Sequence, residues 1–144
     1  MNFPMFVDLT GKKAVVIGAG NIARRRIGVL KDFGAEVTVI APEALDLPEG
    51  VSYLPREYQE GDLQNAYLAV AATNCRQVNH LVKQEADSLG IPVSVADCKD
   101  ECTFFFPAIC RGDNLIAGVV SDGTDHHKTA RAARAIRSVL EDLK

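Results

Sequence analysis

Residues 13–23, with the sequence KAVVIGAGNIA, restrict the fold of this chain more than any other stretch. Ala14 to Ile17 form a short apolar run, which is typical of a strand buried on both faces of a parallel sheet. A G-x-G-x-x-A pattern follows at once, and residues 22–33 have the apolar spacing of an amphipathic helix. A glycine turn between a buried strand and a helix predicts an α/β fold with a Rossmann-like, doubly wound parallel sheet.

Each small residue of this turn has a separate role if the turn binds a dinucleotide. Gly18 permits the tight turn out of the strand, and Gly20 lets the backbone approach a pyrophosphate. Ala23 lets the helix pack close to the strand. The free N–H groups of the first helical turn, which starts at Asn21 and Ile22, would face the phosphates. The alternative is a glycine turn with a purely structural role.

The second predicted strand, residues 36–41, bears on the choice between NAD and NADP. It completes a βαβ unit with a right-handed crossover. An acidic residue about 20 positions after the glycines normally accepts hydrogen bonds from the ribose of NAD. Here Glu43 follows Ala41 and Pro42, and no Lys or Arg stands between Ala41 and Glu49 to bind a 2′-phosphate. The sequence therefore favours NAD, with Ala41 and Pro42 beside the nucleotide.

Polar residues follow two of the later strands. The remaining elements of the sheet are expected in the order strand 51–54, strand 67–72, helix 77–89 and strand 92–96. Thr73 and Asn74 follow the second of these strands, and Asp97 follows the last. Ligands of open α/β folds bind at this carboxyl edge, so all three are candidates for the site. Thr73 or Asn74 can also N-cap the next helix, and His80 in that helix is typical of a surface or packing histidine.

Beyond Asp97 the alternation of strands and helices ends. Residues 103–107 hold three of the six phenylalanines, residues 108–120 predict a β-hairpin, and a helix is expected from about His126 to Leu143. A hydrophobic hairpin at the edge of a sheet needs cover, so we expect a homodimer. The expected division is a NAD-binding Rossmann domain at residues 1–103 and a hairpin-and-helix dimerisation region at residues 104–144.

Composition and the N-terminal segment restrict the class of protein further. The net charge of −3 argues against a general nucleic-acid binder. No apolar run approaches the ~20 residues that span a bilayer, and the N-terminus lacks a signal-like pattern, so a cytoplasmic protein is expected. Residues 3–12 are expected to pack beside the first strand. The four cysteines are expected as free thiols, and the spacing of Cys98 and Cys102 does not predict a metal site.

The predicted C-terminal helix carries a basic residue at every third position. These residues are Lys128, Arg131, Arg134 and Arg137. A solvated basic face is the ordinary interpretation of such spacing. The alternative is a surface that binds a polycarboxylate or a phosphate.

Six segments of the chain, taken in order, resemble one known family. They are residues 4–9 (PMFVDL), the glycine turn at 18–23, residues 39–42 (VIAP), residues 71–74 (AATN) with Asn79, residues 95–97 (VAD) with 104–108 (FFFPA), and residues 121–124 (SDGT). This series is similar to the precorrin-2 dehydrogenase/sirohydrochlorin ferrochelatase family, the NAD-binding half of siroheme synthases. The resemblance covers the whole chain.

The resemblance implies NAD-dependent oxidation of precorrin-2 to sirohydrochlorin, in some members with insertion of Fe²⁺ or Co²⁺. Asp97 falls on the family's catalytic aspartate, a proposed general base, and Asn79 falls in its cofactor site. A polycarboxylate substrate would suit Ser121, Lys128, Arg131 and Arg134 as binding residues. Many family members continue with a helical region that helps to enclose the tetrapyrrole. The alternatives for this chain are a shorter, more open site and an enzyme that needs a partner.

The alternative function is a non-catalytic, NAD-sensing regulatory module built from a single Rossmann unit. Such a module is expected to carry an acid at the end of the second strand, where this chain has Ala41 and Pro42. It also gives no reason for the Phe-rich hairpin or the basic helix. A titration with NAD and then with a tetrapyrrole separates the two hypotheses, because a sensor would bind only the first.

Overall fold

The structure is a computed structural model, and it describes residues 1–44 and 46–144. The chain divides into two compact units, residues 1–104 and residues 105–144. The sequence placed the division after Thr103, and the structure places it after Phe104. The role of the second unit in dimerisation stays a prediction.

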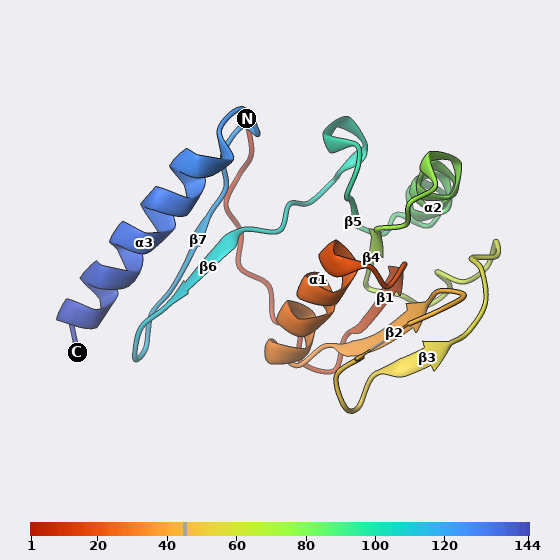
Figure 1. The fold of residues 1–144 in the computed structure, drawn as a ribbon, viewed down its shortest axis with the longest axis horizontal. Helices are drawn as coiled ribbons and strands as arrows, with labels where there is room; N and C mark the ends of the chain where they lie inside the picture. Colours follow the sequence, from red (N-terminus) through yellow and green to blue (C-terminus); the bar gives the residue numbers. More distant parts are fainter. Residues whose placement is uncertain (45) are drawn as a thin grey trace. The chain divides into compact units, whose positions relative to one another are not determined.

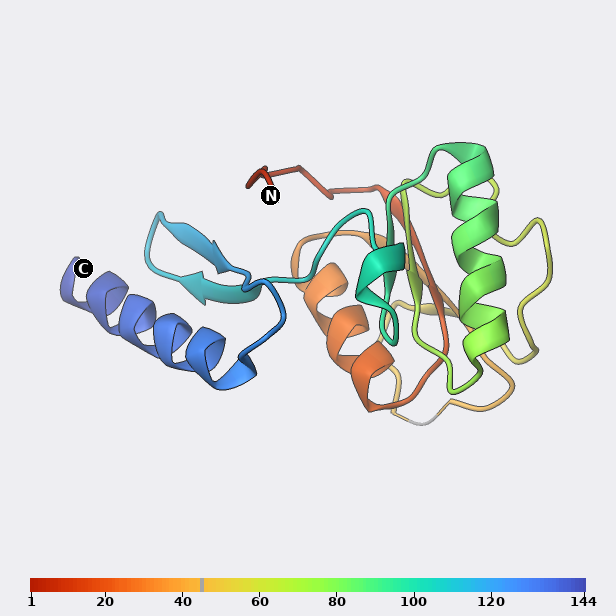
Figure 2. The same cartoon turned by 90° about the horizontal axis from the view of Figure 1, so that it is seen from above.

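The first unit is built on a five-stranded parallel sheet with the strand order β3-β2-β1-β4-β5. Its elements are β1 (Lys13–Ile17), α1 (Asn21–Asp32), β2 (Glu36–Ile40), β3 (Ser52–Leu54), β4 (Leu68–Ala71), α2 (Arg76–Leu89), β5 (Val93–Val95) and the short 3₁₀ turn η1 (Lys99–Glu101). Figures 1 and 2 show this unit from two directions, with α1 and α2 on opposite faces of the sheet. The predicted doubly wound α/β fold is confirmed.

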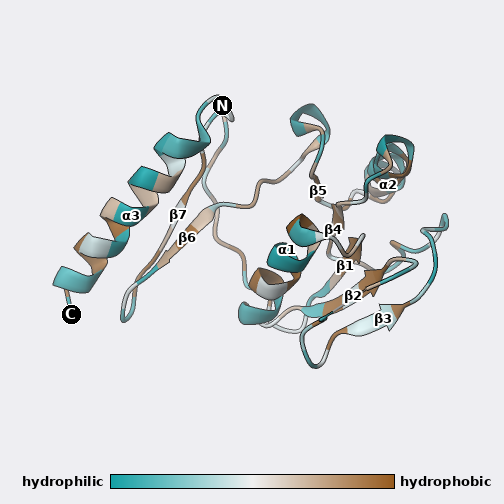
Figure 3. Ribbon diagram, viewed as in Figure 1, coloured by the Kyte–Doolittle hydropathy of each residue, from teal (hydrophilic) through white to brown (hydrophobic). Residues whose placement is uncertain are grey.

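The strand order reverses between β1 and β4, and this reversal determines where a ligand can bind. The chain leaves β1 toward β2 on one side and reaches β4 on the other side. Helices on both faces explain why β4 is buried throughout and β1 is buried from Ala14 onward. Figure 3 shows these strands as hydrophobic segments between helices whose outer faces are hydrophilic. Ligands of such sheets bind at the carboxyl ends of the strands, where the order reverses.

The apolar N-terminal segment differs from its prediction. Residues 1–9 form neither helix nor strand, and Phe3 and Phe6 are 86% and 75% exposed. The expectation that this segment packs beside the first strand is wrong. Because β1 is paired with β2 on one side and with β4 on the other, neither of its edges is free to receive another segment.

The second unit is a β-hairpin with one helix packed on it. Strand β6 (Ala108–Arg111) pairs antiparallel with β7 (Ile116–Val119), and α3 (His126–Asp142) follows. Asp125 caps the helix by accepting a hydrogen bond from the Lys128 N–H at 2.9 Å. Ala133 and Leu140, two turns apart on α3, pack on Cys110 of the hairpin. Other apolar side chains of α3 remain exposed, because a two-stranded hairpin can cover only one face of the helix.

One buried carboxylate, Glu85, and one partly buried carboxylate, Asp62, hold the turn between β3 and β4. Glu85 on α2 accepts hydrogen bonds from the Tyr58 hydroxyl at 2.8 Å and from the backbone N–H groups of Gly61 and Leu63 at 2.6 and 2.7 Å. Asp62 accepts two hydrogen bonds from the Arg56 guanidinium, both at 2.8 Å. These contacts close the turn against α2.

The Arg56–Asp62 pair gives a prediction on stability. The hydrogen bond from Arg56 lowers the pKa of Asp62, and the backbone N–H of Gln59 adds to this shift although burial opposes it. A lowered pKa contributes stability at neutral pH that is lost as the pH falls below about 4. We expect Asp62→Asn to unfold at lower urea concentration at pH 7, with a loss of ~1 kcal/mol. The difference should shrink below about pH 4.

The matched control is Asp87→Asn, which removes an exposed carboxylate paired with Lys83 along α2. Pairs of this kind contribute only ~0.3–0.5 kcal/mol. A loss at Asp62 that does not depend on pH would contradict the electrostatic explanation.

Candidate active site

The glycine turn joins β1 to α1 at the carboxyl edge of the sheet. Gly18 has φ +112°, and a Cβ at this position would lie 2.3 Å from the carbonyl oxygen of Ala72, just after β4. Its N–H donates to the carbonyl oxygen of Ile40 at 2.9 Å. Gly18 therefore lies where the ends of three neighbouring strands meet, and the path of the chain after β4 excludes any side chain there.

Gly20 differs from Gly18 because the space beside it is open. A Cβ at Gly20 would have no heavy atom within 4 Å among the residues that the structure describes. Gly20 is the N-cap of α1, and among residues 1–44 and 46–144 no side chain caps this helix start. Asn21 and Ile22 are exposed, and Arg24 donates to the Asn21 side chain, which brings a guanidinium close to the helix start. An uncapped helix N-terminus with open space beside it fits a pyrophosphate.

The end of β2 is held by a residue that the sequence did not indicate. The hydroxyl of Tyr53 on β3 donates to the carbonyl oxygen of Ala41 at 2.9 Å. Ala41 is buried, and Pro42 and Glu43 are exposed. The carboxylate of Glu43 is thus accessible to a ribose at this edge, as the NAD interpretation requires. A single Tyr in a three-residue strand gave no signal of this bracing role.

The polar residues after β4 form a closed hydrogen-bond set. Asn79 is fully buried, and its Oδ1 accepts from the Thr73 N–H at 3.0 Å and from the Thr73 hydroxyl at 2.7 Å. Its Nδ2 donates to the Thr73 carbonyl oxygen at 3.1 Å. No surface of Asn79 is left for direct cofactor contact, so its predicted role becomes an indirect one, the shaping of the loop. The N-cap alternative for Thr73 or Asn74 is wrong, because Cys75 is the N-cap of α2.

Asp97 follows β5 at the same edge, and it belongs to a series of charged side chains that contact one another. Arg76 on α2 donates from Nη1 to Asp97 Oδ1 at 2.7 Å and from Nη2 to Glu101. The other carboxylate oxygen of Glu101 lies 2.7 Å from His80 Nδ1. Sequence reasoning missed Arg76 and Glu101, because the two residues stand 25 positions apart. His80, interpreted from the sequence as a surface or packing histidine, is exposed and contacts Glu101 in this series of charged side chains.

The charge states of Arg76 and Glu101 follow from these contacts. Desolvation is the largest single effect on both Arg76 and Glu101 and opposes their ionisation, but the hydrogen bonds and opposite charges of their partners together outweigh it. The pKa of Arg76 is raised by Glu101 and Asp97, and the pKa of Glu101 is lowered by His80 and Arg76. Both groups are therefore charged at neutral pH.

The residues predicted to bind the substrate lie in the second unit. Ser121 accepts a hydrogen bond from the Gly123 N–H at 3.1 Å, and the side chains of Lys128, Arg131 and Arg134 are exposed. Arg137 differs from these three, because its guanidinium donates to the Ile109 carbonyl oxygen at 3.0 Å and ties α3 to the hairpin. The residues predicted to bind the cofactor, and Asp97, thus all lie in the first unit. Binding of the substrate by Ser121, Lys128, Arg131 and Arg134 stays a prediction.

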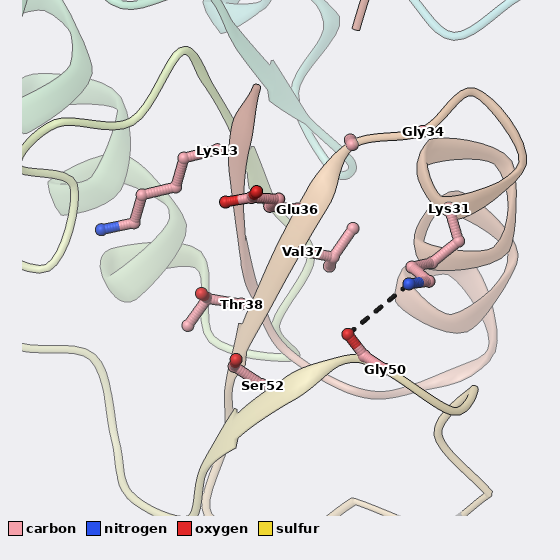
Figure 4. Close-up of a pocket in the computed structure, with 9 residues that line it drawn as sticks. Lys13, Lys31, Gly34, Glu36, Val37, Thr38, Gly50 and Ser52 are labelled. Atoms are coloured by element: carbon pink, nitrogen blue, oxygen red, sulfur yellow. Dashed lines mark hydrogen bonds between the residues drawn. The ribbon is translucent and has the colours of Figure 1, made fainter. Parts of the chain in front are cut away.

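A pocket of about 580 Å³ lies near the opposite edge of the sheet, where β2 begins (Figure 4). Lys31 reaches across from α1 to the carbonyl oxygen of Gly50 at 3.5 Å. The lining residues are Lys13, Lys31, Gly34, Ala35, Glu36, Val37, Thr38, Gly50 and Ser52. Because the glycine turn follows the other end of β1, this pocket is separate from the candidate dinucleotide site.

The described residues, 1–44 and 46–144, contain no group of three or more His, Cys, Asp or Glu side chains arranged to hold a metal ion. None of their helices combines the length and the apolar character needed to cross a bilayer. All four cysteines are free thiols, with Cys110 buried and Cys75 exposed.

Comparison with known proteins agrees with this geometry. Residues 5–108 match a family model described as "Putative NAD(P)-binding". The chain is 42% identical over 148 residues to a "Probable multifunctional siroheme biosynthesis protein HemA" of Ruminiclostridium josui, covering 99% of this chain and 28% of that protein. A siroheme synthase of Methylobacillus flagellatus is 36% identical over 146 residues, covering 97% of this chain and 30% of that protein.

A solved structure is also similar. It is described as "SirC, precorrin-2 dehydrogenase", with a TM-score of 0.81 and 28% sequence identity, and the match covers 96% of this chain and 71% of that one. The chain spans about three-tenths of the length of the curated relatives. The expected cofactor is confirmed at the level of an NAD(P)-binding domain. The chain belongs to this NAD(P)-binding family and is a relative of siroheme synthases and of a precorrin-2 dehydrogenase.

Proposed function

We propose that this chain catalyses the NAD-dependent dehydrogenation of precorrin-2 to sirohydrochlorin. The observation that carries the proposal is the position of Asp97, a partly exposed carboxylate at the same sheet edge as the uncapped glycine turn. The similarity to siroheme synthases and to a precorrin-2 dehydrogenase supports the choice of substrate. The absence of Lys or Arg between Ala41 and Glu49 supports NAD over NADP.

The residues of the first unit have distinct roles in this reaction. NAD, when bound, supplies the acceptor for the hydride that leaves the tetrapyrrole. The backbone at Gly20, Asn21 and Ile22 would hold the pyrophosphate, because no described side chain caps this helix start or comes within 4 Å of a Cβ at Gly20. Asp97 accepts the proton that leaves the substrate as a double bond forms, which is the task of a general base. Its carboxylate is accessible enough to pass that proton to water.

The second unit supplies the charges and the surface that the substrate and a partner subunit require. Ser121, Lys128, Arg131 and Arg134 bind the substrate carboxylates in this proposal, since guanidinium and ammonium groups pair with carboxylates. The hairpin exposes Leu115, Ile116 and Val120, and a second copy of the chain would cover them. A homodimer in the cytoplasm is part of the proposal, and the four free thiols fit that reducing compartment.

The experiment that tests the function is to mix the purified protein with NAD and precorrin-2 and to follow NADH and sirohydrochlorin together. We expect equal amounts of both products. Saturable binding of the tetrapyrrole without any NADH would overturn the proposal. Binding of NAD without any binding of a tetrapyrrole would favour the sensor module instead. Addition of Fe²⁺ to the completed reaction tests metal insertion in the same sample.

A further inference from the structure

Arg76 connects Asp97 to a second carboxylate through the two ends of its guanidinium. Nη1 donates to Asp97 Oδ1 at 2.7 Å, and Nη2 donates to Glu101 Oε2. A guanidinium is planar and rigid, so fixing one of its ends fixes the direction of the other. The position of Asp97 Oδ1 therefore depends on Glu101, through Arg76.

Glu101 is itself held from a second side. Its Oε1 lies 2.7 Å from His80 Nδ1, one turn of α2 beyond Arg76. The side chain of Glu101 is only 20% exposed, whereas those of Arg76 and Asp97 are 45% and 37% exposed. Glu101, the least exposed of the four side chains, is thus held by both Arg76 and His80, whose own side chain is 51% exposed.

Stability alone does not account for this arrangement. Ion pairs between side chains as exposed as Arg76 and Asp97 contribute little to folding, because solvent screens the two charges. Within the described part of the chain, Asp97 Oδ2 has no hydrogen-bond partner, whereas Oδ1 is held. One oxygen is therefore fixed by a cation, and the other is left available to a ligand at the sheet edge.

We infer that Arg76 is the positioning residue for the base, holding Asp97 Oδ1 so that Oδ2 accepts the substrate proton. This inference rests on the proposed function. The step is a simple proton transfer, in which the substrate C–H or N–H bond breaks and an O–H bond forms at Oδ2. Arg76 stays charged throughout and takes no proton. Misplacement of a reacting group by about 1 Å can cost ~10²-fold in rate, so the contribution appears in kcat.

The charged neighbours of Asp97 define the controls. On η1, Lys99 and Asp100 lie between Asp97 and Glu101 in the sequence. On α2, Lys83 is paired with Asp87 and not with Asp97 or Glu101. Lys83→Ala therefore removes a cation from the same helix without touching the site, and it is the matched control for Arg76→Ala.

The test compares turnover of precorrin-2 by the wild-type protein, Arg76→Ala, Arg76→Lys and Lys83→Ala. We expect kcat to fall ~10–10²-fold in Arg76→Ala, with the Kd for NAD unchanged and the KM for precorrin-2 within about threefold. Arg76→Lys should recover part of the rate, since one ammonium can hold one carboxylate. Millimolar guanidinium chloride should restore turnover to Arg76→Ala, and equimolar urea, which is uncharged, should not.

Three results would overturn the inference. The first is a kcat for Arg76→Ala within twofold of the wild-type value. The second is a raised KM for precorrin-2 at unchanged kcat, which would make Arg76 a substrate-binding residue. The third is a rate loss that guanidinium does not reverse in a variant with a wild-type circular dichroism spectrum. Wild-type protein without turnover would instead overturn the proposed function, so the two failures are distinct. If Arg76→Ala fails to fold, Arg76→Lys and Glu101→Gln are compared with the wild-type protein instead. A loss of kcat is expected for both variants.

Discussion

Asp97→Asn is expected to lower kcat for precorrin-2 by ~10²–10⁴-fold, the usual contribution of a general base. The amide has the size of the carboxylate and can still accept a hydrogen bond from Arg76, but it cannot take a proton at neutral pH. Because Asp97 lies at the end of β5 and away from the helix start of α1, the Kd for NAD should remain unchanged. Steady-state NADH formation and calorimetric titration with NAD measure the two quantities.

The control for this variant is Asp100→Asn, which removes an exposed carboxylate from the neighbouring η1 turn. It changes the net charge by the same amount and should keep nearly the whole of the turnover. An Asp97→Asn protein with more than a tenth of the wild-type kcat would remove Asp97 from the role of base. Turnover in that variant would then point to another group at the carboxyl edge.

Gly18→Ala is expected to have the largest effect on folding of any single methyl group added to this chain. The methyl would stand 2.3 Å from a backbone oxygen, at φ +112°, where an L-residue is strained. The obstacle is backbone rather than a flexible side chain, so neither atom can move without separating β1 from β4. We expect a loss of at least ~3 kcal/mol in the free energy of unfolding, measured by urea denaturation.

The matched variant is Gly20→Ala, two residues further along the same turn. Its φ of −75° suits any residue, and the added methyl meets no described atom within 4 Å. Stability should therefore fall by less than ~1 kcal/mol, whereas the Kd for NAD should rise at least ~tenfold, because the methyl occupies space that a phosphate needs. Equal effects of the two variants on stability, or unchanged NAD binding in Gly20→Ala, would contradict the division of roles between the glycines.

Local signals along the chain were sufficient for most of the fold. The apolar runs at Ala14–Ile17 and at residues 67–72 are long enough to require cover on both faces, and a parallel sheet with helices on either side provides it. Gly34 and Gly90, at φ +83° and +67°, end the stretches that the sequence assigned to helices. Such signals act within a few residues, so the sequence displays them directly.

The sequence was less reliable where burial depends on which surfaces are already covered. Phe3 and Phe6 are apolar yet exposed, because the strand they were expected to join is paired on both sides. Asn79 is polar yet fully buried, because Thr73 donates twice to its Oδ1 and accepts from its Nδ2. The hydropathy of a side chain indicates whether its burial is favourable. Whether it is buried depends on whether the neighbouring elements leave a surface for it to pack on.

The sequence by itself determined the parallel sheet, the glycine turn and the arrival of Asp97 at the carboxyl edge, because each depends on a short run of residues. Only the tertiary structure decided which partner each site residue has. Arg76 and Glu101 meet across 25 positions, and Tyr53 braces Ala41 from the neighbouring strand. Such contacts depend on side-chain geometry at the ends of separate elements, and no spacing along the chain records that geometry.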